Sequence, residues 1–312
     1  MSNRTDGWSR RTVVAAAAGA AAGVTTGRSG PAVAGDAPSP PLRSQVALVT
    51  GAARGIGRAA AVALAEAGAD IVAVDVAAQA IQLDYDLATP ADLAETGRLV
   101  RRTRRRCLTI EADVRDAGQM HDAVERTVAE FGRIDIVVPN AGIVSYHPLA
   151  ELSPRQWADV IDVNLTGVAN TIRPAIPRLT ARQRGAIIVT GSTEGRHGAP
   201  QLTHYSAAKW GVIGLVKSLA VELGPANVRV NAVAPTGVRT PLVLNEVTYR
   251  WAGGTGPEAL EAALRNYNTL PVGLLEPADV AAAITFLASP AARHISGTVL
   301  DVSAGASSRW NA

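Results

Sequence analysis

A tyrosine, a lysine and a serine in the second half of the chain are able to support acid–base chemistry together. Tyr205 and Lys209 are four residues apart, which places the phenol and the ammonium on one face of a helix, one turn apart. A tyrosine acts as an acid or base near neutral pH only if its pKa falls well below about 10, and a neighbouring cation lowers it. Ser192 precedes Tyr205 by 13 residues and follows an apolar run. These side chains predict a proton-transfer site at the carboxyl end of a parallel sheet.

The lysine content of the chain strengthens this interpretation. Lys209 and Lys217 are the only lysines among 30 basic residues, so the chain otherwise uses arginine. A lysine one turn after a tyrosine then indicates a need for a compact ammonium. Taken alone, the Tyr-x-x-x-Lys spacing favours an ordinary surface pair. Lys217 has no such partner.

A glycine-rich turn near residue 51 predicts a dinucleotide site. Gly51, Gly55 and Gly57 follow one apolar run and open an alanine-rich helix, where backbone N–H groups approach a pyrophosphate. Asp75 ends the next apolar run, 18 residues after Gly57, where a carboxylate accepts hydrogen bonds from ribose hydroxyls and repels a 2′-phosphate. Arg54 favours NADP slightly, but Asp75 outweighs it. The predicted cofactor is NAD.

Short β-branched runs alternate with helix-length segments from residue 45 onward. This pattern predicts an α/β fold, a Rossmann-type doubly wound parallel sheet in a single domain. The predicted strands are Gln45–Thr50, Ile71–Asp75, Cys107–Ala112, Ile134–Val138, Ala186–Thr190, Val228–Val233 and Thr298–Val302. The predicted helices are Ile56–Gly68, Asp116–Phe131, Ser153–Arg182 and Thr203–Leu223. Two irregular stretches, Val76–Gly97 and Thr236–Leu270, are expected to be long loops.

The first 41 residues differ in composition from the rest and predict a leader. Arg10 and Arg11 precede an Ala/Gly-rich run of 12 residues, Val13–Val24, well short of the ~20 that span a bilayer. Ala32-Val33-Ala34 offers a small-residue cleavage site, as in a twin-arginine export signal. A cytoplasmic protein with a disordered extension is the alternative. The predicted domain covers residues 42–306, and residues 307–312 form a tail.

Several other functions are disfavoured by the sequence. Residues 1–34 carry the whole net charge of +3, so the neutral remainder does not predict a nucleic-acid partner. Cys107 is the single cysteine and the five histidines lack metal-ligand spacing, so no metal site is expected. Thr190 and Glu194 stand where the serine elbow of a hydrolase needs glycines around Ser192. His147, His197 and His204 are interpreted as solvated loop residues or as residues of a substrate mouth.

In these combined motifs the chain resembles the short-chain dehydrogenase/reductase family over about residues 43–306. The motifs are TGAARGIG at 50–57, Asp75, Asp113-Val114, Asn140-Ala141-Gly142, Asn164, Ser192, Tyr205-x-x-x-Lys209 and Pro235–Thr240. One departure is Pro139, where the family usually has an asparagine.

The resemblance implies a role for each matching residue. Tyr205 is the general acid/base, Ser192 binds the substrate oxygen, Lys209 binds the nicotinamide ribose and lowers the tyrosine pKa, and Asn164 holds a water in the proton relay. The residues it implies for NAD binding are Gly51, Arg54, Gly55, Ile56, Gly57, Asp75, Asp113, Val114, Asn140, Gly142, Tyr205, Lys209, Val238 and Thr240.

A narrower resemblance concerns the segment from Asp75 to Asp113, which lies 38 positions later. The insert DYDLATPADLAET at 84–96 is similar to that of the mycofactocin-associated dehydrogenases, which hold NAD so tightly that a peptide-derived redox partner recycles it in place. The resemblance implies that the insert covers the adenosine half of NAD. A surface insertion without function is the alternative.

Apolar residues of two segments predict a lipophilic substrate, a secondary alcohol or its ketone. They are Ile143, Val144, Tyr146, Leu242, Val243, Leu244, Tyr249, Trp251, Leu260, Leu264 and Tyr267. Packing of a lid or a subunit contact is the alternative for several of them. The rival functions are an NADPH-dependent 3-oxoacyl reductase and a non-catalytic dinucleotide-binding protein. Segments 153–182 and 203–223 are suited to pairing in a homotetramer, as in the family.

Overall fold

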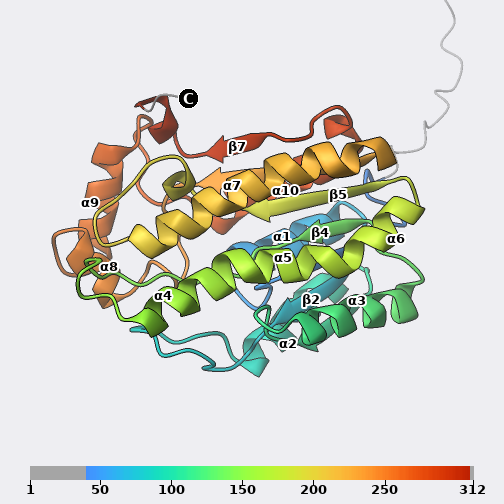
Figure 1. Cartoon of the computed structure of the whole chain (residues 1–312), viewed down its shortest axis with the longest axis horizontal. Helices are drawn as coiled ribbons and strands as arrows, with labels where there is room; N and C mark the ends of the chain where they lie inside the picture. The colour runs from blue at the N-terminus through green and yellow to red at the C-terminus, as the bar shows by residue number, and fades with distance from the viewer. Residues whose placement is uncertain (1–39, 310–312) are drawn as a thin grey trace, which may run out of the picture. The chain divides into compact units, whose positions relative to one another are not determined.

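The computed structural model describes residues 40–309, and seven parallel strands form one sheet within them (Figure 1). The strand order is β3-β2-β1-β4-β5-β6-β7, the doubly wound order that the sequence predicts. The strands are β1 Val46–Thr50, β2 Asp70–Asp75, β3 Cys107–Glu111, β4 Ile136–Val138, β5 Gly185–Thr190, β6 Val228–Pro235 and β7 Val299–Val302. The chain reverses its winding between β1 and β4, and ligands of such sheets bind at the carboxyl ends of the strands there.

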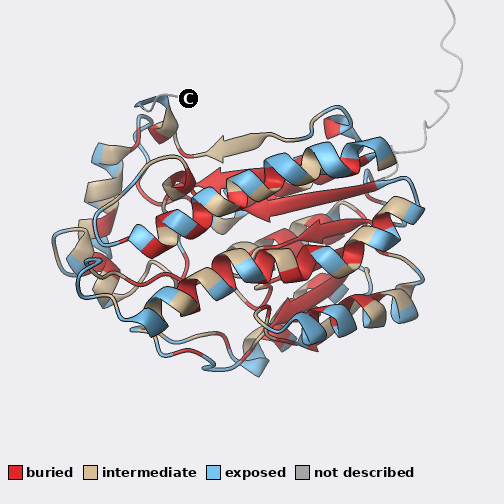
Figure 2. Ribbon diagram, viewed as in Figure 1, coloured by how far each residue is buried: buried red, intermediate tan, exposed pale blue. Residues whose placement is uncertain are grey.

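Helices cover both faces of the sheet and form two apolar cores. One core joins α1, α2 and α10 to one face, and the other joins α3 to α7 to the opposite face. Figure 2 shows the strands between them largely buried, as expected for Val/Ile-rich parallel strands. The helices are α1 Gly55–Glu66, α2 Pro90–Arg102, α3 Ala117–Phe131, α4 Pro154–Ile161, α5 Gly167–Ile172, α6 Ile176–Ala181, α7 Thr203–Leu223, α8 Glu246–Trp251, α9 Pro257–Tyr267 and α10 Pro277–Ala288.

The two stretches expected to be loops contain three helices, so that prediction was wrong in part. Helix α2 begins inside the first stretch, where Thr89 accepts a hydrogen bond from the Asp92 N–H and Pro90 occupies the first turn. Gly97 disfavours a helix locally, yet a Cβ there would lie 3.0 Å from Thr109 Cγ2. The glycine therefore allows α2 to pack closely on β3. The second stretch holds α8 and α9.

The long segment predicted as the helix Ser153–Arg182 is divided into several pieces. After α4, a π-helical turn at Asp162–Thr166 precedes α5. Such turns are rare and often occur at functional sites. The turn contains Asn164, whose place is described below.

The leader predicted for residues 1–41 lies outside the described residues apart from Pro40 and Pro41. Within residues 40–309, no helix is both long and apolar enough to cross a bilayer.

Candidate active site

The turn between β1 and α1 is built around glycines. Gly51 and Gly55 have φ values of +63° and +57°, which side chains rarely tolerate. A Cβ on Gly57 would lie 2.0 Å from the Gly51 carbonyl oxygen. Arg54, at the N-cap of α1, makes no side-chain capping hydrogen bond, so the N–H groups of the first turn remain available to an anion. The residues at this turn fit a pyrophosphate.

Asp75 lies at the carboxyl end of β2, beside the glycine turn. Its carboxylate accepts hydrogen bonds from the Ala53 N–H at 2.9 Å and the Ala77 N–H at 3.1 Å. Burial raises the pKa of Asp75, while these two backbone donors act in the opposite direction. A carboxylate fixed at this edge of the cavity is positioned to accept hydrogen bonds from ribose hydroxyls.

Asn140 joins the ends of three central strands. Its side-chain amide donates to the carbonyl oxygens of Thr50 and Gly51, and its Oδ1 accepts from the Thr190 hydroxyl at 3.1 Å. The preceding Pro139 lacks an N–H but uses its carbonyl to accept from the Thr190 N–H at 3.0 Å. The departure at Pro139 therefore leaves the strand ends joined.

Ser192, Tyr205 and Lys209 meet at the carboxyl end of β5. Tyr205 and Lys209 lie on α7, with the Lys209 Nζ 5.6 Å from the centre of the Tyr205 ring. Lys209 is buried and donates to the Thr190 carbonyl oxygen at 2.9 Å. Ser192 begins the 3₁₀ turn after β5 and hydrogen-bonds Tyr205. The structure thus brings together the three predicted catalytic side chains.

The expected lowering of the tyrosine pKa is not what this arrangement produces. Burial raises the pKa of Tyr205, and the hydrogen bond from Ser192 offsets only part of this effect. Burial also lowers the pKa of Lys209 to about 8, because the ammonium is desolvated. Both groups are buried, which their spacing in the sequence does not reveal.

Asn164 supports the loop after β4 rather than facing the cavity. In the π-helical turn, its Oδ1 accepts from the Ile143 N–H at 3.0 Å and its Nδ2 donates to the Ile143 carbonyl at 2.7 Å. A Cβ on Gly142 would lie 2.8 Å from Asn164 Oδ1 and 3.9 Å from Lys209 Nζ. Asn164 therefore fixes the backbone next to Lys209, and its role in a proton relay stays a prediction.

One elongated cavity of about 670 Å³ connects the predicted residues. Those that line it are Gly51, Arg54, Ile56, Asp75, Asp113, Val114, Asn140, Gly142, Ser192, Tyr205, Lys209, Val238 and Thr240. Three predicted residues, Gly55, Gly57 and Asn164, do not line it. The cavity extends from the end of β2 to α9, and its volume lies in the usual range for cofactor sites.

The substrate end of the cavity is walled by aromatic and aliphatic side chains. Tyr146 and Trp251 stack with ring centres 5.3 Å apart, and Leu242, Val243 and Leu264 complete the wall. Two residues predicted for this mouth do not line the cavity: Tyr249 and Leu244 pack with Leu260 and Leu274 in a separate apolar cluster. These two therefore pack within their own segment instead of forming the mouth.

The three histidines differ in their surroundings. His197 lines the cavity, and its Nε2 lies 2.6 Å from the Tyr267 hydroxyl. His204 is fully buried and bonds the Ser145 hydroxyl at 2.8 Å, while His147 bonds Gln156 at 2.9 Å. Only His197 therefore belongs to the mouth.

Two residues that line the cavity, Glu194 and Tyr85, were not predicted from the sequence. Glu194 follows Ser192 by two residues and reaches the substrate end. Tyr85, the one aromatic residue of the 84–96 insert, accepts a hydrogen bond from the Val144 N–H at 3.0 Å. An aromatic residue between two aspartates, Asp84 and Asp86, is a weak sign that Tyr85 packs against another part of the chain.

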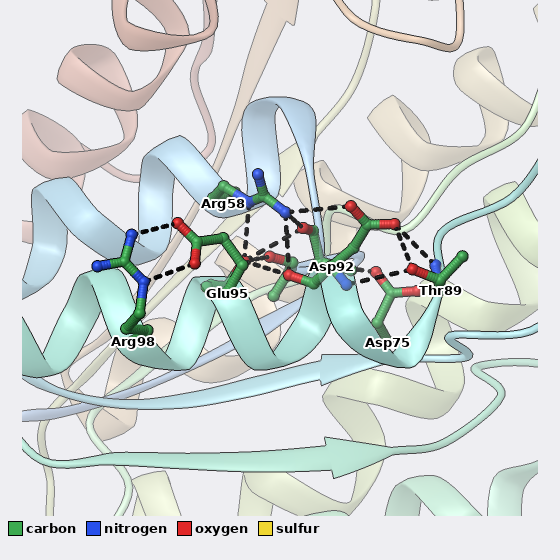
Figure 3. A network of polar contacts seen from close by, with 9 residues as sticks. Arg58, Asp75, Thr89, Asp92, Glu95 and Arg98 are labelled. Carbon is green, nitrogen blue, oxygen red and sulfur yellow. Dashed lines mark hydrogen bonds and ion pairs between the residues drawn. The ribbon is translucent and has the colours of Figure 1, made fainter.

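The polar network of Figure 3 joins the insert to the glycine turn between β1 and α1. Arg58 of α1 donates to the Asp92 carbonyl at 2.9 Å and to Thr96 Oγ1 at 3.0 Å, and both acceptors lie on α2. Thr96 in turn donates to the Ala52 carbonyl at 2.9 Å, and Arg54 donates to the Asp86 carbonyl. The insert therefore contacts the glycine turn on one side and, through Tyr85, the loop after β4 on the other.

Comparison with known proteins agrees with this geometry. Residues 45–249 match the family model described as short chain dehydrogenase. A (-)-trans-carveol dehydrogenase of Rhodococcus erythropolis is 44% identical over 270 residues, which cover 85% of this chain and 98% of that protein. The crystal structure of a carveol dehydrogenase from Mycobacterium avium in complex with NAD has 42% identity and a TM-score of 0.83, covering 85% of this chain and 98% of its own. A short chain dehydrogenase from Mycobacterium paratuberculosis bound to NAD has 37% identity and a TM-score of 0.79, covering 86% and 99%.

Proposed function

The chain belongs to the short-chain dehydrogenase family, and from this premise we propose that it is an NAD-dependent dehydrogenase for a lipophilic secondary alcohol and its ketone. The observation that carries the proposal is the meeting of Ser192, Tyr205 and Lys209 in one cavity with Asp75. A protein that only senses dinucleotides has no need of these three side chains beside an apolar mouth. The carveol dehydrogenases support a cyclic alcohol as the substrate.

The residues present fit NAD along the whole cavity. The Gly51–Ile56 turn is assigned to the pyrophosphate and Asp75 to the adenosine ribose. Asp113 and Val114 are assigned to adenine, Asn140 and Gly142 to the adenosine side, Lys209 to the nicotinamide ribose, and Val238 and Thr240 to the carboxamide. Bound NAD supplies the hydride acceptor and, when oxidised, a positive charge near Tyr205.

In the proposed reaction, this chain's residues control one proton and one oxygen. Ser192 donates a hydrogen bond to the substrate oxygen, and Tyr205 as phenolate removes the hydroxyl proton during oxidation. In reduction, the Tyr205 hydroxyl returns the proton. Because burial raises the pKa of Tyr205, the phenolate needs a nearby positive charge. Lys209 would supply one, and oxidised NAD, when bound, would add another.

A turnover assay tests this function. Purified protein is supplied with NAD, a panel of cyclic and acyclic secondary alcohols including carveol, and an artificial electron acceptor. Ketone formation is expected with cyclic alcohols. A protein that binds NAD but oxidises no alcohol with either NAD or the acceptor would support the non-catalytic alternative, and activity only on 3-oxoacyl thioesters with NADPH would support the reductase.

Replacing Asp75 with alanine is expected to narrow the preference for NAD over NADP. The hydrogen bonds between a carboxylate and the ribose hydroxyls are lost, so NAD binding weakens by about tenfold or more. NADP binds better because the repulsion of its 2′-phosphate is removed. Fluorescence titration of the two reduced cofactors measures both effects. Asp75→Asn, which keeps an acceptor oxygen for Ala53, is the control for damage to the loop, and equal affinity of the wild type for both cofactors contradicts the assignment.

The insert supports a second part of the proposal, that NAD is held tightly and reoxidised in place by a mycofactocin-type redox partner. Tyr85→Phe removes the hydroxyl that accepts from the Val144 N–H, so release of NAD is expected to accelerate about fivefold, as for one lost hydrogen bond. Stopped-flow displacement of bound NADH measures the rate. Tyr249→Phe is the matched control, because Tyr249 does not line the cavity. Unchanged release in Tyr85→Phe contradicts a covering role for Tyr85.

Tight retention is compatible with the leader predicted from the sequence, because the twin-arginine route carries folded proteins. We therefore expect the mature protein to begin near Gly35, outside the cytoplasm, with NAD bound. N-terminal sequencing and extraction of dinucleotide from fractionated cells test this expectation. A cytoplasmic protein beginning near Met1, or an exported protein without NAD, would break the link between export and retention.

A homotetramer is also part of the proposal. Trp210 and Val221 of α7 and Trp157 of α4 leave large apolar surfaces exposed, with Val221 81% exposed. These helices are the ones that the sequence predicts to pair with other copies of the chain.

A further inference from the structure

Glu194 occupies a fixed position at the substrate end of the cavity. It lies in the 3₁₀ turn Thr193–Gly195, and its N–H donates to Ser192 Oγ at 3.1 Å. A Cβ on Gly195 would lie 2.8 Å from the Lys209 carbonyl oxygen, so the turn is pressed against α7. The Glu194 side chain is only 15% exposed. Its backbone is therefore held between two residues of the proposed catalytic group.

One carboxylate oxygen of Glu194, Oε1, lies beside the His197 ring. The His197 Nδ1 lies 3.0 Å from the Gly198 carbonyl oxygen, which only accepts, so Nδ1 carries a proton. The opposite ring atom, Nε2, lies 3.3 Å from Glu194 Oε1 and 2.6 Å from the Tyr267 hydroxyl. Nε2 thus accepts from the Tyr267 hydroxyl, and Oε1 lies beside the same ring atom.

The other oxygen, Oε2, is buried and has no hydrogen-bond partner among residues 40–309. A buried carboxylate oxygen without a donor is unfavourable, and most buried polar atoms in proteins are paired. The two cations of this region bond elsewhere: the Arg196 guanidinium pairs with Asp301 at 3.3 Å, and Lys209 Nζ donates to the Thr190 carbonyl.

Glu194 also lies among the phenols that surround the substrate end. Burial is the main cause that raises the pKa values of Tyr146, Tyr205 and Tyr267, and the charge of Glu194 adds to it for each. Burial raises the pKa of Glu194 itself to about 7. Apart from the group formed by Glu194, His197 and Tyr267, the wall is largely apolar. Glu194 therefore lines a cavity whose wall otherwise suits a hydrocarbon ring.

We propose that Glu194 is a specificity-determining residue: its Oε2 accepts a hydrogen bond from a second hydroxyl group of the alcohol substrate, and its charge disfavours substrates with a carboxylate at that end. This inference rests on the proposed dehydrogenase function. It narrows the substrate class to cyclic secondary alcohols that carry a second hydroxyl on a substituent or ring carbon away from the reacting carbon.

Three matched substrates test the inference. Cyclohexanols with an ethyl, a hydroxymethyl or a carboxylate group on the same ring carbon differ little in size but differ in donor and charge. The 3- and 4-substituted compounds, each as separated cis and trans isomers, vary the distance between the reacting carbon and the group that faces Glu194. The wild type is expected to show a kcat/KM about tenfold or more higher for hydroxymethyl than for ethyl in at least one series, as for a hydrogen bond to a charged group. Carboxylate is expected to be the poorest substrate.

Two variants separate the hydrogen bond from the charge. Glu194→Leu is expected to bring the hydroxymethyl-to-ethyl ratio close to one. Glu194→Gln keeps an acceptor, so it is expected to retain part of this ratio while the kcat/KM for the carboxylate rises about tenfold. Glu246→Gln removes an exposed carboxylate of α8 that does not line the cavity, and its ratios are expected to match the wild type. Thermal unfolding with NADH shows which variants keep the fold.

A hydroxymethyl-to-ethyl ratio of kcat/KM near one for the wild type in both series overturns the inference, and so does a ratio that is unchanged in Glu194→Leu. In either case, NAD-dependent oxidation of the ethyl compound leaves the proposed function intact. If the protein oxidises no alcohol, calorimetry measures the binding of the ethyl and hydroxymethyl alcohols to NADH-loaded protein instead. If no alcohol is oxidised but the hydroxymethyl compound binds more tightly and Glu194→Leu removes the difference, the dehydrogenase function fails and the recognition by Glu194 stands. Equal binding of the two compounds counts against Glu194.

Discussion

Replacing Tyr205 with phenylalanine is expected to lower kcat by about 10³-fold, the largest effect of any single change in this site. The phenylalanine ring fills the same space, but the group that removes and returns the substrate proton is lost. NAD binding is expected to remain, because Asp75 and the glycine turn lie at the other end of the cavity. Steady-state turnover with the best alcohol of the panel and titration with NADH measure the two quantities on one preparation.

Ser192→Ala and Tyr249→Phe are the comparisons for this result. Ser192→Ala removes a donor to the substrate oxygen, so a loss of about 10²-fold or more is expected. Tyr249→Phe changes a tyrosine of the apolar cluster behind the mouth and is expected to leave kcat unchanged. Near-normal turnover by Tyr205→Phe would show that the assigned mechanism is wrong.

Replacing Lys209 with arginine is expected to lower kcat by about 10²-fold although the positive charge is kept. Lys209 is 4% exposed and its Nζ donates to the Thr190 carbonyl, so a larger planar guanidinium does not fit the same place. The distance to the Tyr205 ring, 5.6 Å for the ammonium, then also changes. Single-turnover hydride transfer measures the loss without a contribution from product release.

The pH dependence gives this variant an independent readout. Burial lowers the pKa of Lys209 to about 8, so its charge is present below that pH and is lost as the pH rises through it. Activity that depends on this charge is expected to fall above pH 8 in the wild type. An arginine remains charged throughout, so the fall is expected to disappear in Lys209→Arg. An arginine variant with wild-type kcat would contradict the requirement for a compact ammonium.

The parts of this site that follow local rules were predictable from the sequence. Gly51, Gly55 and Gly57 mark a turn between a strand and a helix, and Asp75 ends the next strand, so the sheet places them together. The spacing of Tyr205 and Lys209 fixes their shared helix face. The doubly wound parallel sheet also followed from the alternation of strands and helices, because βαβ connections leave few alternatives.

The parts that depend on contacts distant in sequence were not predictable. The surroundings of Glu194 are formed by His197 and by Tyr267, which lies 73 residues later in the chain. The Tyr85 hydroxyl is bonded by the N–H of Val144, which lies in another loop, 59 residues later in the chain. The pKa of Tyr205 is governed by burial, which the pair Tyr205 and Lys209 alone does not reveal. The start of helix α2 was placed wrongly because Gly97 outweighed the capping signal at Thr89.

Transfer of deuterium from the alcohol to the cofactor tests the central claim most directly. Carveol labelled with deuterium at the carbinol carbon is mixed with NAD-loaded protein, and the cofactor is extracted and examined by mass spectrometry together with the ketone. This readout does not require the cofactor to exchange. The proposed function predicts labelled NADH equal in amount to the ketone for the wild type, and none for Tyr205→Phe. Ketone that appears without deuterium in the cofactor, or an NAD-loaded wild type that labels its cofactor from no alcohol of the panel, would contradict it.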